Sequence, residues 1–318
     1  MDAPSLKDVY AARPRVYGGV SPTPLMRHPL LAAETGLDIY VKHENHNPTG
    51  SFKVRGGLNL VASLSPDERR GVITASTGNH GQSIALACRR EGVPCTVIVP
   101  LHNNPEKNAA MRAYGADVIE LGRDFDESRE EAERRQREGG LRYVHSANEP
   151  LLLAGVGTYA LEIFEALPDA DVIFVPIGGG SGACGCAIVR TGIGSGAAII
   201  GVQAARADAF ARSWHGPARV IGERAETFAE GMATRVTFDL TFGILQRALA
   251  DVVTLTEDEL AEGVRLALRT THNLAEGAGA APLAAAVKRR ARLAGKKVVC
   301  VMTGANLDRS TLARITAI

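Results

Sequence analysis

The length and charge of the chain exclude several classes of protein. With 318 residues it can form two modest domains around a substantial core, but a formal net charge of +1 at pH 7 provides no positive surface for nucleic acid or an anionic membrane. Because no apolar stretch is long enough to span a bilayer and the N-terminus lacks the apolar region of a signal peptide, we expect a cytoplasmic protein.

Strand-like and helix-like segments alternate along the whole chain. The strand-like segments lie near residues 38–43, 71–75, 95–99, 117–121, 142–145, 171–177, 198–203, 252–255 and 297–302. This alternation predicts an α/β fold with parallel strands that helices cover on both faces. Residues 71–121 alternate strand, helix, strand, helix, strand, a unit able to form a small domain.

A lysine motif follows the first of these strands. Lys53 lies in the run NPTGSFKVRG, residues 47–56, whose small residues allow close backbone approach and offer hydroxyl donors. Most lysines are solvated surface charges. The surroundings of Lys53 instead indicate a lysine at a binding site.

A polar loop, STGNHG (residues 76–81), follows the strand near 71–75 and precedes a helix-like segment. In that order the backbone N–H groups of the loop are free to meet a ligand at the helix N-terminus. The same residues are also compatible with an ordinary strand–helix connection, in which Thr and Asn act as caps.

Two more loops follow apolar strands. The strand near 171–177 ends in GGGSG (residues 178–182), where consecutive glycines let backbone N–H groups converge on an anion, although flexible turns have the same composition. The strand near 297–302 ends in TGAN (residues 303–306), which is also compatible with a plain turn after a core strand.

In this order, the four motifs resemble those of the fold type II pyridoxal-phosphate enzymes of the threonine dehydratase and serine racemase family. The likeness covers about residues 20–312 and implies two domains with parallel-rich twisted sheets, as in the tryptophan synthase β subunit. The implied boundaries are a large cofactor-binding domain of residues 1–70 plus 149–318 and a small mobile domain of residues 71–148. The cofactor is expected in the cleft between them, at the carboxyl ends of strands.

The resemblance also implies which residues bind pyridoxal 5'-phosphate. Lys53 would be the catalytic lysine that forms the Schiff base, and Thr303 would face the pyridine nitrogen. A hydroxyl there is essentially never ionised, so it cannot keep a proton on the ring, which suits prompt loss of a β-leaving group. Ser181 replaces a glycine of the family and adds a hydroxyl donor. The full set of implied cofactor-binding residues is Lys53, Phe52, Asn79, Gly178, Gly179, Gly180, Ser181, Gly182, Gly231, Glu276 and Thr303.

The implied substrate-binding residues surround the carboxylate of an amino acid. They are Ser76, Thr77, Gly78, His80 and, more distantly in the sequence, Arg129. Thr77 stands where serine racemases have the serine that serves the second face of the cofactor. Its β-methyl restricts χ1, so we predict that elimination outcompetes racemisation.

We therefore predict an ammonia-lyase that converts a 3-hydroxy amino acid, such as threonine, serine or 3-hydroxyaspartate, into a 2-keto acid and ammonia. The resemblance implies a homodimer of the short catabolic form, without a regulatory domain. The alternatives are a serine or aspartate racemase, a β-replacement enzyme and a non-catalytic protein that binds the cofactor. Retention of Lys53, Asn79 and Thr303 argues against the last of these.

We expect no metal site. In related enzymes two carboxylates hold a divalent cation after the strand that follows the glycine loop, but Gln203 and Ala209 stand at those positions, and Asp208 alone is a poor substitute. The cysteines have no zinc-site spacing, and their odd number argues against a disulfide framework. We predict small buried thiols at Cys88, Cys95, Cys184, Cys186 and Cys300.

Overall fold

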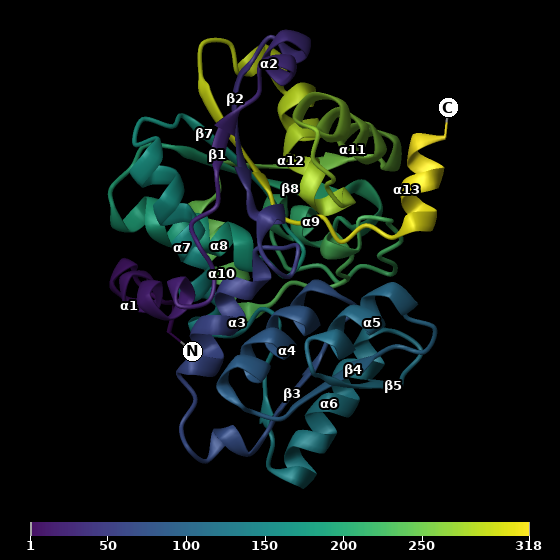
Figure 1. Cartoon of the computed structure of the whole chain (residues 1–318). Coiled ribbons are helices and arrows are strands. Elements are labelled where there is room, and N and C mark those ends of the chain that lie inside the picture. The colour runs from purple at the N-terminus through teal and green to yellow at the C-terminus, as the bar shows by residue number, and fades with distance from the viewer. Residues whose placement is uncertain (1, 318) are drawn as a thin grey trace.

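Two sheets organise the chain, one of six strands and one of four (Figure 1). The computed structural model describes residues 2–317, except the side chain of Asp126. The strands are β1 (Leu25–Arg27), β2 (Asp38–His43), β3 (Val72–Ala75), β4 (Cys95–Val99), β5 (Asp117–Glu120), β6 (Arg142–Tyr143), β7 (Val172–Pro176), β8 (Ala198–Ala204), β9 (Asp251–Leu255) and β10 (Lys297–Met302). The helices are α1 (Leu6–Tyr17), α2 (Pro29–Thr35), α3 (Lys53–Ala62), α4 (Asn79–Glu91), α5 (Pro105–Ala113), α6 (Phe125–Gly139), α7 (Pro150–Ala166), α8 (Ser181–Gly192), α9 (Ala209–His215), α10 (Asp239–Ala248), α11 (Glu257–Thr271), α12 (Gly277–Lys288) and α13 (Arg309–Thr316).

The predicted α/β class is confirmed, and each of the nine predicted strand segments contains a strand. The additional strand, β1, pairs antiparallel with β2 at the edge of the large sheet. It has only three residues, and none of them is fully buried. A segment this short and this exposed shows no alternation of apolar and polar residues, so the sequence pattern could not reveal it.

The large sheet has the order β1-β2-β10-β7-β8-β9, and every pair beyond β1–β2 is parallel. Side chains of a strand alternate between its two faces. Accordingly, Ile173 and Val175 of β7 pack into one core with α7 and α8, whereas Val172 and Phe174 pack into a second core with α11 and α12. Both faces are therefore covered, which explains the continuous apolar run of this strand.

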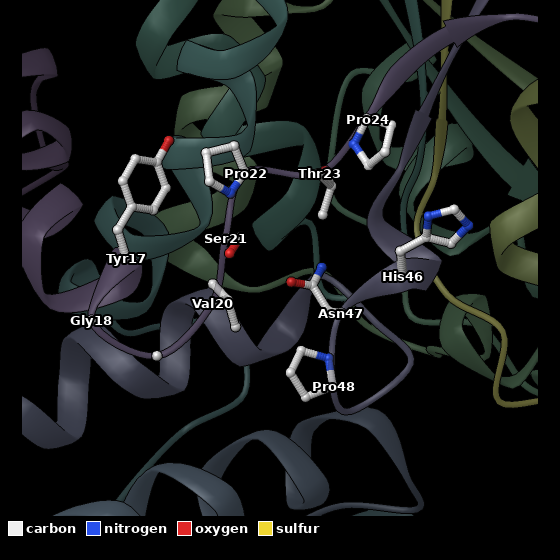
Figure 2. A pocket seen from close by; sticks show the side chains of 11 residues that line it. Tyr17, Gly18, Val20, Ser21, Pro22, Thr23, Pro24, His46, Asn47 and Pro48 are labelled. Atoms are coloured by element: carbon white, nitrogen blue, oxygen red, sulfur yellow. The ribbon is translucent and has the colours of Figure 1, made fainter.

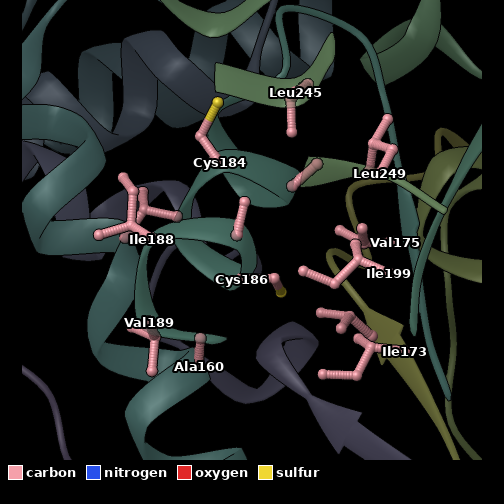
Figure 3. Close-up of a cluster of buried hydrophobic side chains, with 14 of the residues drawn as sticks. Ala160, Ile173, Val175, Cys184, Cys186, Ile188, Val189, Ile199, Leu245 and Leu249 are labelled. Atoms are coloured by element: carbon pink, nitrogen blue, oxygen red, sulfur yellow. The ribbon is translucent and has the colours of Figure 1, made fainter. Parts of the chain in front are cut away.

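The first of these cores contains two cysteines among aliphatic side chains (Figure 3). Cys184 and Cys186 of α8 lie there with Ile173, Val175 and Ile199. All five cysteines are buried free thiols, which confirms the prediction made for them. Burial raises the pKa of Cys184 well above its usual value, so this thiol packs as a small apolar group.

The small sheet has the order β5-β4-β3-β6, and all its strands are parallel. Its core also includes Val54, Leu58 and Val61, which belong to α3. Helix α3 packs against α4 of the small sheet and against α7 of the large sheet (Figure 1). The helix that begins at Lys53 is thus held between the two sheets.

The carboxyl ends of the central strands carry the four motifs. Strand β2 leads into the loop before Lys53, β3 into the loop at residue 76, β7 into the loop at residue 178 and β10 into the loop at residue 303. Parallel strands present their carboxyl ends at one edge of a sheet, where α/β proteins place ligands. Within residues 2–317, no helix is long and apolar enough to cross a membrane.

Candidate active site

Lys53 is the first residue of α3, and its amine lies at the start of another helix. Nζ donates a hydrogen bond to Ser181 Oγ, the first residue of α8, at 2.9 Å. The ammonium also lies 5.2 Å from the centre of the Phe52 ring. Burial, opposed in part by the charge of Glu276, lowers the pKa of Lys53 to about 8. The amine is therefore closer to its neutral, nucleophilic form than an ordinary lysine.

Backbone hydrogen bonds join the loop before Lys53 to the loop that follows β10. The backbone N–H of Phe52 donates to the carbonyl of Thr303 at 3.0 Å, and that of Ala305 donates to the carbonyl of Gly50 at 2.8 Å. These loops meet because β2 and β10 are neighbouring parallel strands. Thr303, which is only 2% exposed, is thereby brought to the same edge as Lys53.

The glycine loop can hold an anion at the N-terminus of α8. Gly180 has a φ of +90°, a backbone conformation that favours glycine. A Cβ at Gly178 would collide with the carbonyl oxygen of Gly231, so the loop packs directly on the turn of Glu230–Met232. The first N–H groups of a helix have no partner within it, and the helix dipole favours negative charge there. Together with Lys53, the loop suits a ligand with a phosphate and a carbonyl group.

Asn79 is held by two side chains from the large sheet's side of the site. Its Nδ2 donates to Glu276 Oε1 at 2.7 Å, while its Oδ1 accepts from Asn306 Nδ2 at 2.6 Å. Burial raises the pKa of Glu276. Sequence reasoning assigned no role to Asn306, and the only signal was its place at the end of the TGAN motif. The pair of hydrogen bonds fixes both the position and the orientation of the Asn79 amide.

The loop at residues 76–80 lies beside Lys53, and its side chains differ in whether they already have hydrogen-bond partners within the protein. Ser76 Oγ accepts hydrogen bonds from the N–H groups of Gly78 and Gly81, at 3.1 and 2.9 Å. Thr77 is partly exposed. His80 Nε2 is paired with Thr74 Oγ1 at 3.0 Å, inside the small sheet.

The ring of His80 is neutral. Burial, helped by the nearby charge of Lys53, lowers the pKa of His80 to about 3. Because its ring already pairs with Thr74, the geometry favours the backbone N–H groups of the loop, rather than the imidazole, as the donors for a carboxylate.

Arg129 lies on α6, which packs against β3 and β4 of the small sheet. Its Nη1 donates to Glu133 Oε1, one turn along the same helix, at 2.7 Å. Its positive charge acts on His145, whose pKa it helps to lower. The role in substrate binding that the resemblance implies for Arg129 stays a prediction.

An ion pair that no motif indicated joins the two sides of the site. Lys107 Nζ, on α5, lies 2.6 Å from Glu230 Oε2, on the turn that carries Gly231. Lys107 is 9% exposed, and its side chain lies against Gly78. Sequence reasoning missed this pair because its partners are 123 residues apart in the chain.

A separate pocket of about 480 Å³ lies beside the beginning of the lysine motif (Figure 2). It contains none of the predicted site residues and is lined by Tyr17, Gly18, Gly19, Val20, Ser21, Pro22, Thr23, Pro24, His46, Asn47 and Pro48. The Tyr17 hydroxyl on its wall is already bound to Glu162, at 2.8 Å.

The residues at the metal position expected in related enzymes have protein partners. Gln203 Oε1 accepts from the N–H of Ala211 at 2.8 Å, and its Nε2 donates to the carbonyl of Ile177 at 3.3 Å. Asp208 pairs with Arg212 at 3.0 Å. Among the side chains that the structure describes, there is no group of three or more His, Cys, Asp or Glu that could hold a metal ion. The predicted independence from metals has yet to be tested.

Comparison with known proteins supplies a family and several relatives. A family model described as pyridoxal-phosphate dependent enzyme matches residues 16–304. The L-threonine ammonia-lyase of Thermotoga maritima is 38% identical over 98% of this chain and 78% of its own length. The L-threo-3-hydroxyaspartate ammonia-lyase of Saccharomyces cerevisiae is 32% identical over 99% of this chain and 97% of its own. The structure of maize serine racemase superposes with a TM-score of 0.92 at 27% identity, covering 98% of this chain and 97% of that one.

Proposed function

The chain belongs to the pyridoxal-phosphate-dependent enzyme family, and we propose that it is an ammonia-lyase that removes the hydroxyl of a 3-hydroxy amino acid by β-elimination. The products are a 2-keto acid and ammonia. The observation that carries the proposal is the amine of Lys53, held 2.9 Å from a hydroxyl at the N-terminus of α8, with its pKa lowered to about 8.

The residues present fit pyridoxal phosphate. The Lys53 amine can bind the aldehyde of the cofactor, and the helix start after Gly178–Gly180 has the close backbone approach that a phosphate needs. Asn79, fixed by Glu276 and Asn306, would donate to the ring hydroxyl. Thr303 would place a hydroxyl at the ring nitrogen.

The protein residues then position the substrate and move its proton. Bound pyridoxal phosphate withdraws electron density from Cα of an amino acid, which makes the proton on Cα acidic. The Lys53 amine accepts that proton, and a pKa lowered to about 8 gives it more of the neutral, basic form near pH 7 than an ordinary lysine has. The N–H groups at the start of α4 hold the substrate carboxylate, with Thr77 beside it.

Elimination is favoured over racemisation by the residue at position 77. Racemisation requires a proton donor on the face of the cofactor opposite Lys53, and Thr77 is the residue that resemblance implies for that face. Its β-methyl restricts χ1 and crowds the space over Cα, and a misplacement of about 1 Å can slow a reaction on the order of a hundredfold. The racemase alternative is supported by the likeness to serine racemase structures.

The test is a panel of 3-hydroxy amino acids given to the purified enzyme, with 2-keto acid, ammonia and the chirality of the residual substrate measured together. We expect keto acid from at least one member and little of the opposite enantiomer. Abundant opposite enantiomer without keto acid would establish the racemase alternative. A Thr77→Ser variant should raise racemisation, and no rise would show that residue 77 does not control that face.

The remaining expectations are also part of the proposal. We propose a cytoplasmic homodimer in which a small domain of residues 71–148 moves relative to the rest of the chain. Helix α3, which packs against both sheets, would lie next to any such movement. Size-exclusion chromatography with light scattering would determine the oligomeric state.

A further inference from the structure

His145 lies at the carboxyl end of the small sheet, directly after β6. The N–H of Val144 donates to the carbonyl of Ile73 at 2.9 Å, and Thr74 Oγ1 donates to the carbonyl of Val144 at 2.7 Å. The backbone is therefore fixed up to the residue before His145. The loop that follows leads into α7.

Two backbone donors determine the tautomer of His145. The N–H groups of Ala147 and Asn148 both donate to Nδ1, at 2.9 and 3.0 Å. A ring nitrogen that accepts hydrogen bonds carries no proton, so the proton of the neutral ring lies on Nε2. Burial, together with the positive charge of Arg129, lowers the pKa of His145 to about 4. Near pH 7 the ring therefore has a single donor, the Nε2–H group.

The surroundings bring the loop of His145 against the glycine loop of the site described above. The ring makes an edge contact with Phe238, with centres 4.9 Å apart. A Cβ at Gly179 would lie 3.1 Å from Ala147 Cβ and 3.6 Å from the Phe238 ring, so the loop of His145 packs on the glycine loop. The charge of Lys53 is close enough to help lower the pKa of His145.

The Nε2–H group is available to a ligand. Nδ1 is occupied by the loop of the histidine itself, and none of the side chains that the structure describes accepts a hydrogen bond from Nε2. The N-terminus of α4 supplies donors for the substrate carboxylate. A further neutral donor next to the glycine loop is therefore free for the side chain of the substrate.

We propose that His145 is a specificity-determining residue that donates a hydrogen bond from Nε2–H to the β-hydroxyl oxygen of the substrate. The inference rests on the proposed function. His145 transfers no proton. The oxygen leaves as water with the C–O electron pair and the proton that the Lys53 amine took from Cα, and the Cα–H electrons form the Cα–Cβ double bond. His145 holds the hydroxyl in one orientation and stabilises the negative charge that grows on oxygen as the C–O bond breaks. Amino acids without an oxygen at that position leave the donor unpaired and are bound less well.

Two variants distinguish the role of Nδ1 as an acceptor from the role of Nε2–H as a donor. In His145→Asn, the amide oxygen can replace Nδ1 as the acceptor of the loop, but the distal donor is lost. In His145→Gln, the longer amide can place an N–H donor where Nε2 stood. His215→Asn, at an exposed position on α9, is the matched control.

The reaction is measured with two leaving groups, using the hydroxy amino acid that the unmodified holoenzyme prefers and β-chloro-L-alanine. Chloride departs without help from a hydrogen-bond donor. For His145→Asn we expect kcat/KM to fall about 10- to 100-fold with the hydroxy amino acid, as for the loss of one hydrogen bond to a developing charge. With β-chloroalanine the fall should be less than about threefold. The kcat/KM of His145→Gln should be higher than that of His145→Asn with the hydroxy amino acid but not with β-chloroalanine. The kcat/KM of His215→Asn should match that of the unmodified enzyme with both substrates.

Equal losses with both substrates would overturn the proposal, as would a Gln variant no better than the Asn variant. Thermal denaturation shows whether each variant is folded. A readout independent of turnover is the ¹⁵N spectrum of histidine-labelled holoenzyme, in which the signal lost in His145→Asn should be that of a neutral Nε2–H ring. A protonated ring or an Nδ1–H ring at pH 7 would reject the assignment. Failure of the unmodified enzyme with every hydroxy amino acid would instead reject the proposed function.

Discussion

Two cations lie on one helix, Lys53 at a partly buried position and Arg55 at a fully buried one, and their partners differ. Arg55 is fully buried and contacts two carboxylates, Glu44 at 2.7 Å and Glu162 at 2.6 Å. Lys42 adds a second cation to this cluster, 2.5 Å from Glu162. The buried cluster of Lys42, Glu44, Arg55 and Glu162 thus contains two positive and two negative charges.

The comparison shows that the partner, rather than burial alone, decides the charge state. Burial on its own would lower the pKa of Arg55, but Glu44 and Glu162 raise it above its usual value. Lys53 has a hydroxyl as its hydrogen-bond partner, and burial lowers its pKa to about 8. A fully paired charge stabilises a geometry, whereas an incompletely paired amine is available for chemistry. Two residues apart on α3, the chain uses both arrangements.

The largest effect is expected from removing the incompletely paired amine. Lys53→Ala should lower the rate of keto acid release by about a thousandfold or more, because the base that takes the Cα proton is lost. The visible absorbance of the bound cofactor should change as well. Lys296→Ala, at an exposed position, is the control and should keep full activity. Near-normal activity of Lys53→Ala would contradict the assigned role.

The cluster around Arg55 should matter for folding instead. Glu162→Gln leaves Arg55 and Lys42 with one carboxylate fewer inside the protein, and loss of one partner of a buried pair costs about 3–5 kcal/mol of stability. Its control lies one turn along the same helix: Glu165 pairs with Arg13 at the surface, so Glu165→Gln should cost less than about 1 kcal/mol. Chemical denaturation measures the free energy of unfolding of both variants. Similar losses of stability in the two would contradict the special role of the buried cluster.

The lowered pKa of Lys53 predicts a dependence of stability on pH. In the unfolded chain the lysine stays protonated up to its usual pKa of 10.5, whereas the folded protein releases the proton near pH 8. The penalty for burying the charge is therefore complete below pH 8 and disappears as the pH rises towards 10.5.

In cofactor-free protein, Lys53→Met should accordingly be more stable than the unmodified chain by about 3 kcal/mol at pH 7. The difference should shrink between pH 8 and pH 10.5. Urea denaturation at several pH values measures the difference directly, and other titrating groups cancel between the two proteins. A difference that stays constant with pH would show that Lys53 is not desolvated in the folded state.

The smallest expected effect is that of a chelator. The cluster around Arg55 balances its charges internally. Gln203, at a position where the resemblance implies a carboxylate ligand, and the nearby Asp208 both have protein partners. Incubation with EDTA should leave the rate of keto acid release and the melting temperature unchanged. A reversible loss of activity, restored by magnesium or calcium, would reveal a cation site that the residues do not predict.

Much of the architecture could be predicted from local patterns. A β7 strand buried on both faces has a continuous apolar run, and a loop that must approach Gly231 closely carries Gly178 without a Cβ. Such requirements act on residues that are close together in the chain, so they produce local sequence patterns that can be recognised. For this reason the sequence revealed the order of the strands along the chain and the loops that follow β2, β3, β7 and β10.

By itself, the sequence determined the class of fold, every strand except β1 and the place of the lysine motif. Only the tertiary structure decided which distant side chains meet there. Glu162 lies 107 residues from Arg55, Glu276 lies 197 residues from Asn79, and Glu230 lies 123 residues from Lys107. A hydrogen bond requires two groups within about 3 Å, and that separation depends on how two sheets and their helices pack. No pattern of neighbouring residues records it.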